Sequence, residues 1–208
     1  MSEARLFIVR HGNTFGPGET PLRVGCGTDI PLVDSGIEQA RALGKFFGSN
    51  GIKPELIIAG ELRRAQETAR IICESGDFAP QFESSADFNE IDYGPDEGRT
   101  EEDVVSRVGQ EAIDLWNSDA VVPDGWRVRP AELIEAWRKL AARLERECMG
   151  KTAIVVTSNG VARFAPYITR DYESFKQNYP LKLKTGAFGE FAYSNNVWTA
   201  LRWNVRPS

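Results

Sequence analysis

The sequence predicts a three-layer α/β/α protein in which helices cover both faces of a mostly parallel sheet. Short apolar runs at residues 6–9, 56–59 and 152–157 are typical of strands that are buried on both faces. Segments with helical spacing follow these runs, and such alternation favours parallel strands joined by helical crossovers. The 208 residues fit a single domain, residues 1–208, with a small helical cap-like insertion at about residues 94–130.

In the first half of the chain, turn residues separate the elements. Gly and Pro fill the segment after the first strand, which predicts a loop, and Ser35-Gly36 opens an apolar pattern of helical spacing. The predicted elements are a strand at 6–9, a loop at 12–31, a helix from 35 to about 48, a strand at 56–59, a helix at about 62–73 and a short strand at 81–83.

In the second half, Thr100 is a predicted N-cap followed by three acidic residues, and its helix is expected to carry Val104, Val108, Ala112 and Leu115 on one face. Pro130 fits the first position of another helix, which runs to about residue 147. A strand at 152–157 and a short helix from about residue 160 follow. Residues 188–203 alternate weakly and predict an antiparallel hairpin around residues 194–196.

Composition excludes several classes of function. The formal net charge is −5 and no run of Lys or Arg forms a stripe, so nucleic acid is not expected as a partner. No segment reaches the roughly 20 apolar residues that cross a bilayer, and the N-terminus lacks the apolar region of a signal peptide. The three cysteines are far apart and odd in number, which favours the reducing cytoplasm over a disulfide framework or a zinc site. Whether the chain forms a homodimer is left open.

Polar side chains follow the three buried strands. Arg10 and His11 follow the first strand, Arg64 follows the second, and Ser158 and Asn159 follow the third. Ligands of open α/β sheets bind beyond the carboxyl ends of the strands, so we expect these groups to share one pocket. His11 is the only histidine, which excludes any mechanism that needs two imidazoles from one chain.

These residue types suit phosphate chemistry. A guanidinium such as that of Arg10 disfavours the protonated form of the neighbouring His11, which keeps the imidazole nucleophilic. Arg64 can hold phosphate oxygens in a bidentate fork. Glu90, which lies between the second and third of these segments, can protonate a leaving alkoxide and later activate water.

Five ordered blocks resemble the histidine phosphatase (phosphoglycerate mutase-like) superfamily. Residues 10–14 (RHGNT) resemble RHGxT, where x is Glu, Gln or Asn, and residues 23–36 resemble the stretch RFxGWxDxPL that precedes a glycine. Residues 62–69 resemble LxRAxQTA, residues 90–94 (EIDYG) resemble the segment of the general acid, and residues 155–163 resemble VVTHGGVIR. The resemblance spans about residues 5–165 and implies a phosphoglycerate mutase-like fold.

The resemblance also implies a phosphomonoester hydrolase that works through a phosphohistidine. His11 would take the phosphoryl group of a small phosphorylated metabolite while Glu90 protonates the leaving oxygen, and water would then release inorganic phosphate. The remaining residues that it implies are Arg10 and Arg64 in catalysis, and Asn13, Arg23, Tyr93, Ser158 and Asn159 in binding phosphate or substrate. The family needs neither a metal nor another cofactor, because arginines supply the positive charge.

The chain departs from the family at its second histidine, where Ser158 stands, followed by Asn159. A hydroxyl brings no charge, and losing one such donor typically costs about 10²–10³ in rate. Ser158 could equally cap the next helix or fill space. Two alternatives therefore stay open: a phosphoester-binding pseudoenzyme, and non-hydrolytic chemistry with Glu90 as the base.

A second departure concerns the substrate. Residues 108–123 resemble the mutase stretch YGEEQVKIWRRSFDVP, but the paired arginines that hold phosphoglycerate there are Asn117 and Ser118 here. The upstream mutase lysine falls at Glu101. These changes point away from a phosphoglycerate mutase and leave the natural substrate unidentified.

Overall fold

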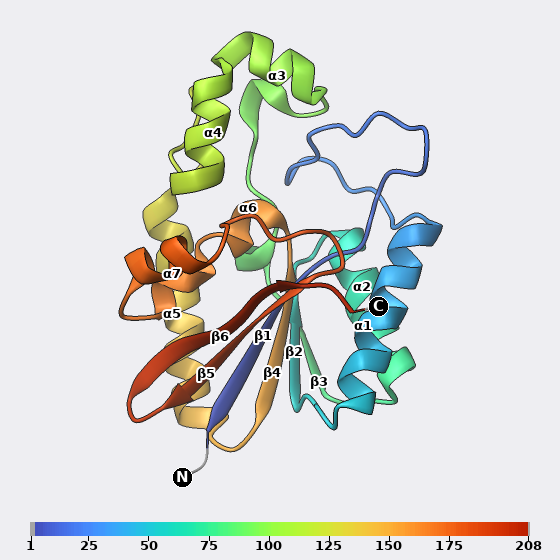
Figure 1. Ribbon diagram of the computed structural model, residues 1–208. Helices are drawn as coiled ribbons and strands as arrows, with labels where there is room; N and C mark the ends of the chain where they lie inside the picture. Colours follow the sequence, from blue (N-terminus) through green and yellow to red (C-terminus); the bar gives the residue numbers. More distant parts are fainter. Residues whose placement is uncertain (1–2, 208) are drawn as a thin grey trace.

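The computed structural model describes residues 3–207, which form a six-stranded sheet in the order β3-β2-β4-β1-β5-β6 (Figure 1). The first four strands of this order run parallel, and β5 runs antiparallel to both of its neighbours, β1 and β6. This arrangement confirms the predicted mostly parallel sheet. The strands are β1 (Ala4–Arg10), β2 (Leu56–Ala59), β3 (Gln81–Ser84), β4 (Thr152–Thr157), β5 (Phe188–Ser194) and β6 (Val197–Val205).

Helices cover both faces of the sheet. Helices α1 and α2 lie on one face and α5 lies on the other (Figure 1). The α-helices are α1 (Asp34–Ser49), α2 (Arg63–Gly76), α3 (Glu101–Val108), α4 (Gln110–Asp119), α5 (Pro130–Glu147), α6 (Asn159–Ala162) and α7 (Tyr172–Asn178). Single turns of 3₁₀-helix are η1 (Ala86–Phe88), η2 (Gly94–Asp96) and η3 (Ala165–Ile168).

Strand β1 is buried on both faces because successive side chains point to opposite sides of the sheet. Leu6 and Ile8 belong to the apolar cluster that contains the buried face of α5, whereas Phe7 and Val9 belong to the cluster that contains those of α1 and α2. The strand therefore delivers the residues that follow it to the middle of the molecule.

The predicted helix over residues 100–115 is wrong in one respect, because Gly109 divides it into α3 and α4. Gly109 has φ = +85°, a conformation that favours glycine, and it ends one helix and begins the next. The break shifts the buried face of α4 to Ile113 and Trp116, while Leu115 is 40% exposed. Thr100 caps α3 as predicted, in a capping box with Asp103.

The predicted C-terminal hairpin is confirmed as β5 and β6. Its turn contains Asn195 and Asn196, with φ values of +52° and +59°. Positive φ at both central residues is typical of the two-residue turns that match the twist of antiparallel strands, and asparagine tolerates this conformation. Helix α7 was not predicted.

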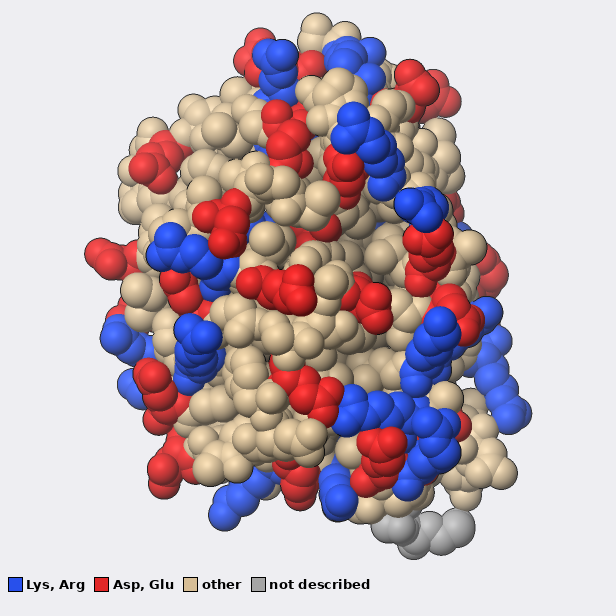
Figure 2. All heavy atoms as spheres, turned by 180° about the vertical axis from the view of Figure 1, so that it is seen from behind, with Lys and Arg blue, Asp and Glu red and all other residues tan. Residues whose placement is uncertain are grey.

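The carboxyl ends of β1, β2 and β4 meet at one edge of the sheet, and this edge positions the candidate site. The loop of residues 12–31 and helices α3 and α4 lie above it (Figure 1). Acidic and basic side chains are interspersed over the face behind that of Figure 1 (Figure 2). Within residues 3–207, no helix has both the length and the apolar character needed to cross a membrane.

The aromatic cluster between α1 and the sheet gives a stability prediction. Phe47 is fully buried, and its ring centre lies 5.1 Å from that of Phe7 and 5.6 Å from that of Phe188. We expect Phe47→Ala to lower the free energy of unfolding by about 3–5 kcal/mol because it leaves a cavity. Urea unfolding followed by circular dichroism measures this. The control Leu115→Ala, on the exposed side of α4, should change it by less than about 1 kcal/mol; equal effects would contradict the packing described.

Candidate functional site

A cavity of about 620 Å³ opens at the carboxyl edge of the sheet. It gathers side chains from the ends of β1 and β4, the start of α2, the loop of residues 12–31 and helices α3 and α4. All predicted site residues except Ser158 line it, namely Arg10, His11, Asn13, Arg23, Arg64, Glu90, Tyr93 and Asn159. These side chains, up to 149 positions apart in the sequence, thus share one pocket. This is the arrangement predicted from their places at the carboxyl ends of the strands.

His11 is 5% exposed, and its Nδ1 lies 2.8 Å from the carbonyl oxygen of Gly12. A carbonyl oxygen only accepts hydrogen bonds, so Nδ1 carries the proton and Nε2 keeps its lone pair. Burial, followed by the charges of Arg10 and Arg64, holds the pKa of His11 well below its usual value. The ring is therefore a neutral imidazole with a nucleophilic Nε2.

Two glycines allow the turn after β1 to pack tightly against the start of α1. A Cβ on Gly12 would lie 2.3 Å from the backbone oxygen of Gly36, and a Cβ on Gly36 would lie 2.2 Å from that of Asn13. The backbone N–H of Gly12 also donates to Oγ1 of Thr68, at 3.1 Å, on α2. This close approach fixes the position of His11 relative to α1 and α2.

Arg64 is fully buried and is held by backbone oxygens. Its Nη1 donates to Thr28 at 2.7 Å, and its Nη2 donates to Gly25 at 3.1 Å, both in the loop of residues 12–31. Arg10 is anchored in the same way, since its Nη1 donates to the carbonyl of Leu183 at 2.9 Å. The Nε atoms of both arginines are buried and have no partner among the described residues. Each guanidinium is thus held in place and keeps an N–H that no described residue accepts.

Glu90 is buried against the start of α6. Its Oε1 accepts hydrogen bonds from the backbone N–H groups of Ile91, at 3.0 Å, and Gly160, at 2.9 Å. Gly160 is required for this contact, because a Cβ there would lie 2.3 Å from Oε1. Burial raises the pKa of Glu90, although the Ile91 N–H and the nearby arginines act in the opposite direction. A protonated carboxyl beside a neutral imidazole suits acid catalysis of the departure of an alkoxide.

Ser158 and Asn159 have different environments. Ser158 is 2% exposed and does not line the cavity, and its hydroxyl makes no capping bond to α6, so the capping interpretation is wrong. Its role in phosphate binding stays a prediction. Asn159 lines the cavity, and its Oδ1 accepts from the N–H of Leu183 at 2.9 Å. This contact orients the amide and leaves its nitrogen available as a donor.

The predicted substrate-binding residues differ in how much of their polar capacity is free. Both polar atoms of the Asn13 side chain are used, because Oδ1 accepts from Thr185 at 2.5 Å and Nδ2 donates to Ser35 at 3.2 Å. Tyr93 is buried, and burial is the main cause that raises its pKa, so it stays a neutral phenol. Arg23 lies over the Tyr93 ring, 5.4 Å from its centre, and forms an ion pair with Glu101.

The sequence analysis did not select Arg163 as a site residue. This arginine is fully buried, lines the cavity and stacks 3.8 Å from the ring centre of Trp116. Burial lowers its pKa to about 10. The signal in the sequence was its place as the last residue of the block at 155–163, where it matches the final arginine of VVTHGGVIR. Lys182 and Thr185 also line the cavity but lie in no motif block.

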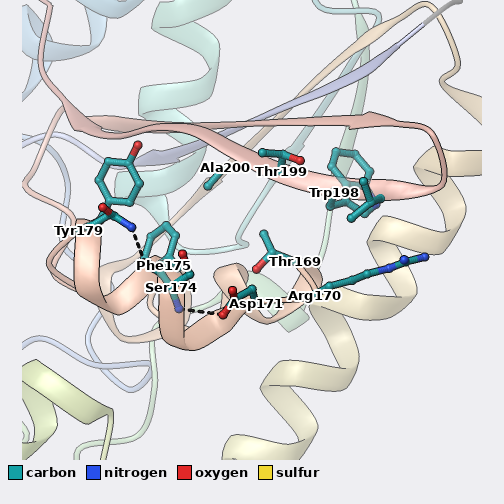
Figure 3. Close-up of a pocket in the computed structure, with 11 residues that line it drawn as sticks. Thr169, Arg170, Asp171, Ser174, Phe175, Tyr179, Trp198, Thr199 and Ala200 are labelled. Atoms are coloured by element: carbon teal, nitrogen blue, oxygen red, sulfur yellow. Dashed lines mark hydrogen bonds between the residues drawn. The ribbon is translucent and has the colours of Figure 1, made fainter.

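A second cavity, of about 450 Å³, lies between α7 and β6 (Figure 3). Its charged side chains are engaged locally: Asp171 accepts from the Ser174 N–H at 2.8 Å, and Arg170 donates to the carbonyl of Asn196 at 3.0 Å. Trp198 and Thr199 contribute from β6 (Figure 3). No imidazole or thiol lines it, so the cavity at His11 is the candidate site.

The sheet order and the buried, neutral histidine at a strand end define a class of α/β proteins, the histidine phosphatase-like fold. The chain belongs to the histidine phosphatase superfamily (branch 1), whose profile matches residues 6–206. This match confirms the predicted family.

Similar proteins include mutases and phosphatases. The 2,3-bisphosphoglycerate-dependent phosphoglycerate mutase of Rhizobium meliloti is 26% identical over 184 residues, which cover 87% of this chain and 86% of that protein. The same enzyme of a Bradyrhizobium species is 30% identical over 126 residues, 59% of each chain.

Among solved structures, a mycobacterial glucosyl-3-phosphoglycerate phosphatase has a TM-score of 0.79 at 18% identity, covering 98% of this chain and 99% of its own. A phosphoserine phosphatase from Entamoeba histolytica, in complex with 3-phosphoglyceric acid, has a TM-score of 0.73 at 22% identity, covering 97% of each chain. At these identities, the structures show the fold.

The environment of His11 predicts its titration. Because the chain has one histidine, labelling with ¹⁵N-histidine gives a single imidazole in the NMR spectrum. We expect the neutral tautomer protonated at Nδ1 at pH 6.5, and a titration midpoint well below 6.5. Arg10→Gln should raise the midpoint because it removes a nearby positive charge, whereas the control Arg129→Gln, at the exposed start of α5, should not. A wild-type midpoint near 6.5 would contradict the buried site.

Proposed function

We propose that the chain is a phosphomonoester hydrolase that acts on a small phosphorylated metabolite through a phosphohistidine at His11. The main observation behind this proposal is the hydrogen bond from Nδ1 of His11 to the carbonyl of Gly12. It leaves Nε2 as the free nitrogen of a ring that lines the cavity. The free Nε–H groups of Arg10 and Arg64 support the proposal, because they can pair with phosphoryl oxygens without breaking a bond to the protein. The unpaired Cys26, Cys73 and Cys148 suit the cytoplasm as the compartment.

In the first step, Nε2 of His11 attacks phosphorus and the bond from phosphorus to the ester oxygen breaks. Glu90 gives its proton to the leaving alkoxide, while Arg10 and Arg64 balance the charge of the transferring phosphoryl group. In the second step, the Glu90 carboxylate takes a proton from water as the water oxygen attacks phosphorus. The phosphorus–nitrogen bond breaks, inorganic phosphate leaves, and His11 and Glu90 return to their starting protonation states.

We propose that Asn159 assists the reaction in place of the second histidine of the family. Its amide is oriented by the N–H of Leu183 and lines the cavity. A neutral amide donor is roughly half as strong as a charged one, so we propose a slower site rather than an inactive one.

The cavity favours hydrolysis over mutase chemistry. Asn117 lines it where the mutases resembled by this stretch have an arginine, and Glu101 lines it where they have a lysine. Ser118 does not line it, and its hydroxyl donates to the carbonyl of Asp114 at 2.9 Å. A site without these cations holds phosphoglycerate less firmly as an acceptor, so water is the proposed acceptor.

A second candidate function is a protein that binds phosphate esters without turning them over. The exclusion of Ser158 from the lining of the cavity favours it, because the position of the second histidine then contributes no donor. This candidate retains Arg10, Arg64 and His11 as an anion site.

The two candidates differ in phosphate release. We expect wild type to release inorganic phosphate from a panel of phosphomonoesters, and His11→Ala to lose at least about 10³ of the rate because the nucleophile is gone. Ser158→His should raise the rate by about 10–10³ if the new imidazole reaches the cavity. The control Lys45→Ala, on the exposed side of α1, should change little.

Trapping the intermediate completes this test. Denaturation of wild type during turnover of a ³²P-labelled ester should leave an acid-labile label that His11→Ala lacks. Wild type that binds inorganic phosphate but releases none from any ester would support the binding protein. Full turnover in His11→Ala would overturn both candidates.

The lowered pKa of His11 and the raised pKa of Glu90 predict where the two limbs of the pH profile of kcat/KM fall. His11 must be deprotonated, which puts the acidic limb below pH 6.5, and Glu90 must be protonated, which puts the basic limb above the usual value of 4.5. Glu90→Gln should remove the basic limb and slow alkyl phosphates by about 10²–10⁴. It should slow 4-nitrophenyl phosphate much less, because nitrophenolate leaves without a proton. Equal losses on both substrates would exclude Glu90 as the acid.

A further inference from the structure

Arg163 is a buried cation with unused donors. It is fully buried, and its Nε and Nη2 have no hydrogen-bond partner among the described residues. Only Nη1 is engaged, with the carbonyl oxygen of Trp116. No ion pair within residues 3–207 involves Arg163. Buried charges in proteins are normally paired, so this side chain has the properties of half of an ion pair whose anion comes from outside.

Arg23 shares the aromatic surface on which Arg163 rests. The guanidinium of Arg23 lies 4.9 Å from the ring centre of Trp126, and that of Arg163 lies 3.8 Å from the ring centre of Trp116. The two indoles touch edge to face, with ring centres 5.2 Å apart. The Trp126 N–H donates to Asp96 at 2.6 Å, which fixes the platform. Both guanidiniums line the cavity, and Nε of Arg23 is also buried without a partner.

This pair of arginines is attached to different elements from the pair that serves the phosphoryl group. Arg10 is the last residue of β1 and Arg64 lies at the start of α2, and they are held by the carbonyls of Leu183 and of the loop of residues 12–31. Arg163 instead follows α6 and stacks on α4. A phosphate held by Arg10 and Arg64 is thus bound through different anchors from a group held by Arg163.

Glu101 is the carboxylate that the chain itself pairs with Arg23. Its carboxylate pairs with Arg23 and lines the cavity, yet its side chain is 63% exposed, at the first position of α3. Because the Glu101 end of this ion pair is open to solvent, an incoming anion can take the place of Glu101 on Arg23. Glu101 also repels any second negative charge on a ligand. It therefore limits how much more tightly the site binds a doubly charged ligand than a singly charged one.

We propose that Arg163 and Arg23 form a second anion subsite, which binds a carboxylate or a second phosphate of the substrate in competition with Glu101. The substrate class is then a phosphomonoester that carries a further anionic group. The inference rests on the proposed function only in placing the ester phosphate at His11, and it concerns binding, so it can be tested without turnover.

The test uses phosphonates, which bind like phosphates but contain no ester bond to hydrolyse. Isothermal titration calorimetry compares propylphosphonate with 3-phosphonopropionate and ethane-1,2-diphosphonate, in which a carboxylate or a second phosphonate replaces the methyl group. Homologues with one methylene fewer or more cover other separations. We expect at least one doubly charged ligand to bind about 10–100-fold more tightly than its singly charged match, as a charge-assisted bond to a buried arginine gives. The better of the two anions identifies the second group.

Two variants test whether Arg163 and Glu101 set the preference for the doubly charged ligand. Arg163→Gln should reduce the advantage of the doubly charged ligand to less than about 3-fold, and Glu101→Gln should enlarge it by about 3–10-fold because the competitor is gone. Arg129→Gln, an exposed arginine outside the cavity, should leave the advantage unchanged. If circular dichroism shows that Arg163→Gln is unfolded, Glu101→Gln decides the outcome, since its side chain is exposed.

No advantage in wild type at any chain length would overturn the subsite. So would an advantage that neither Arg163→Gln nor Glu101→Gln changes. Failure of the proposed function would give a different result. The protein would still bind the doubly charged phosphonate more tightly, but it would release phosphate from no ester.

Discussion

The hydrogen bond from Nδ1 of His11 to the carbonyl of Gly12 fixes the tautomer on which the chemistry of the site depends. It exists because β1 is buried on both faces and ends in the centre of the sheet, where Gly12 packs against Gly36 without side chains between them. Burial and two arginines keep the ring neutral, so one arrangement sets the orientation of the nucleophile and its protonation state.

Burial raises the pKa of Glu90, the proposed acid, whereas it lowers the pKa of His11. Burial of Glu90 favours its protonated form, while the N–H groups of Ile91 and Gly160 hold the carboxyl in place. The lowered pKa of His11 and the raised pKa of Glu90 both favour the neutral base and the protonated acid that the first step of phosphoryl transfer requires. The positive charge that phosphate needs comes from arginines anchored by backbone carbonyls, which are ordered before any ligand binds.

Most of the candidate site could be predicted because strand ends are visible in the sequence. The apolar runs of β1, β2 and β4 placed His11, Arg64 and Asn159 at one edge, and all three line the cavity. Helix α4 shows the limit of local patterns: a single glycine at 109 shifted the buried face from Leu115 to Trp116. That shift has consequences for function, since Trp116 is the surface on which Arg163 stacks.

The sequence by itself determined the family, the succession of strands along the chain, the hairpin turn and the absence of a second histidine. These depend on residue identity and on the short-range periodicity of the chain. Only the tertiary structure decided that Asn159 rather than Ser158 lines the cavity, that Arg163 forms no ion pair within residues 3–207 and that Glu101 pairs with Arg23. The reason is physical: protonation state, burial and pairing depend on groups that approach from distant segments, as Gly160 does to Glu90 across 70 positions.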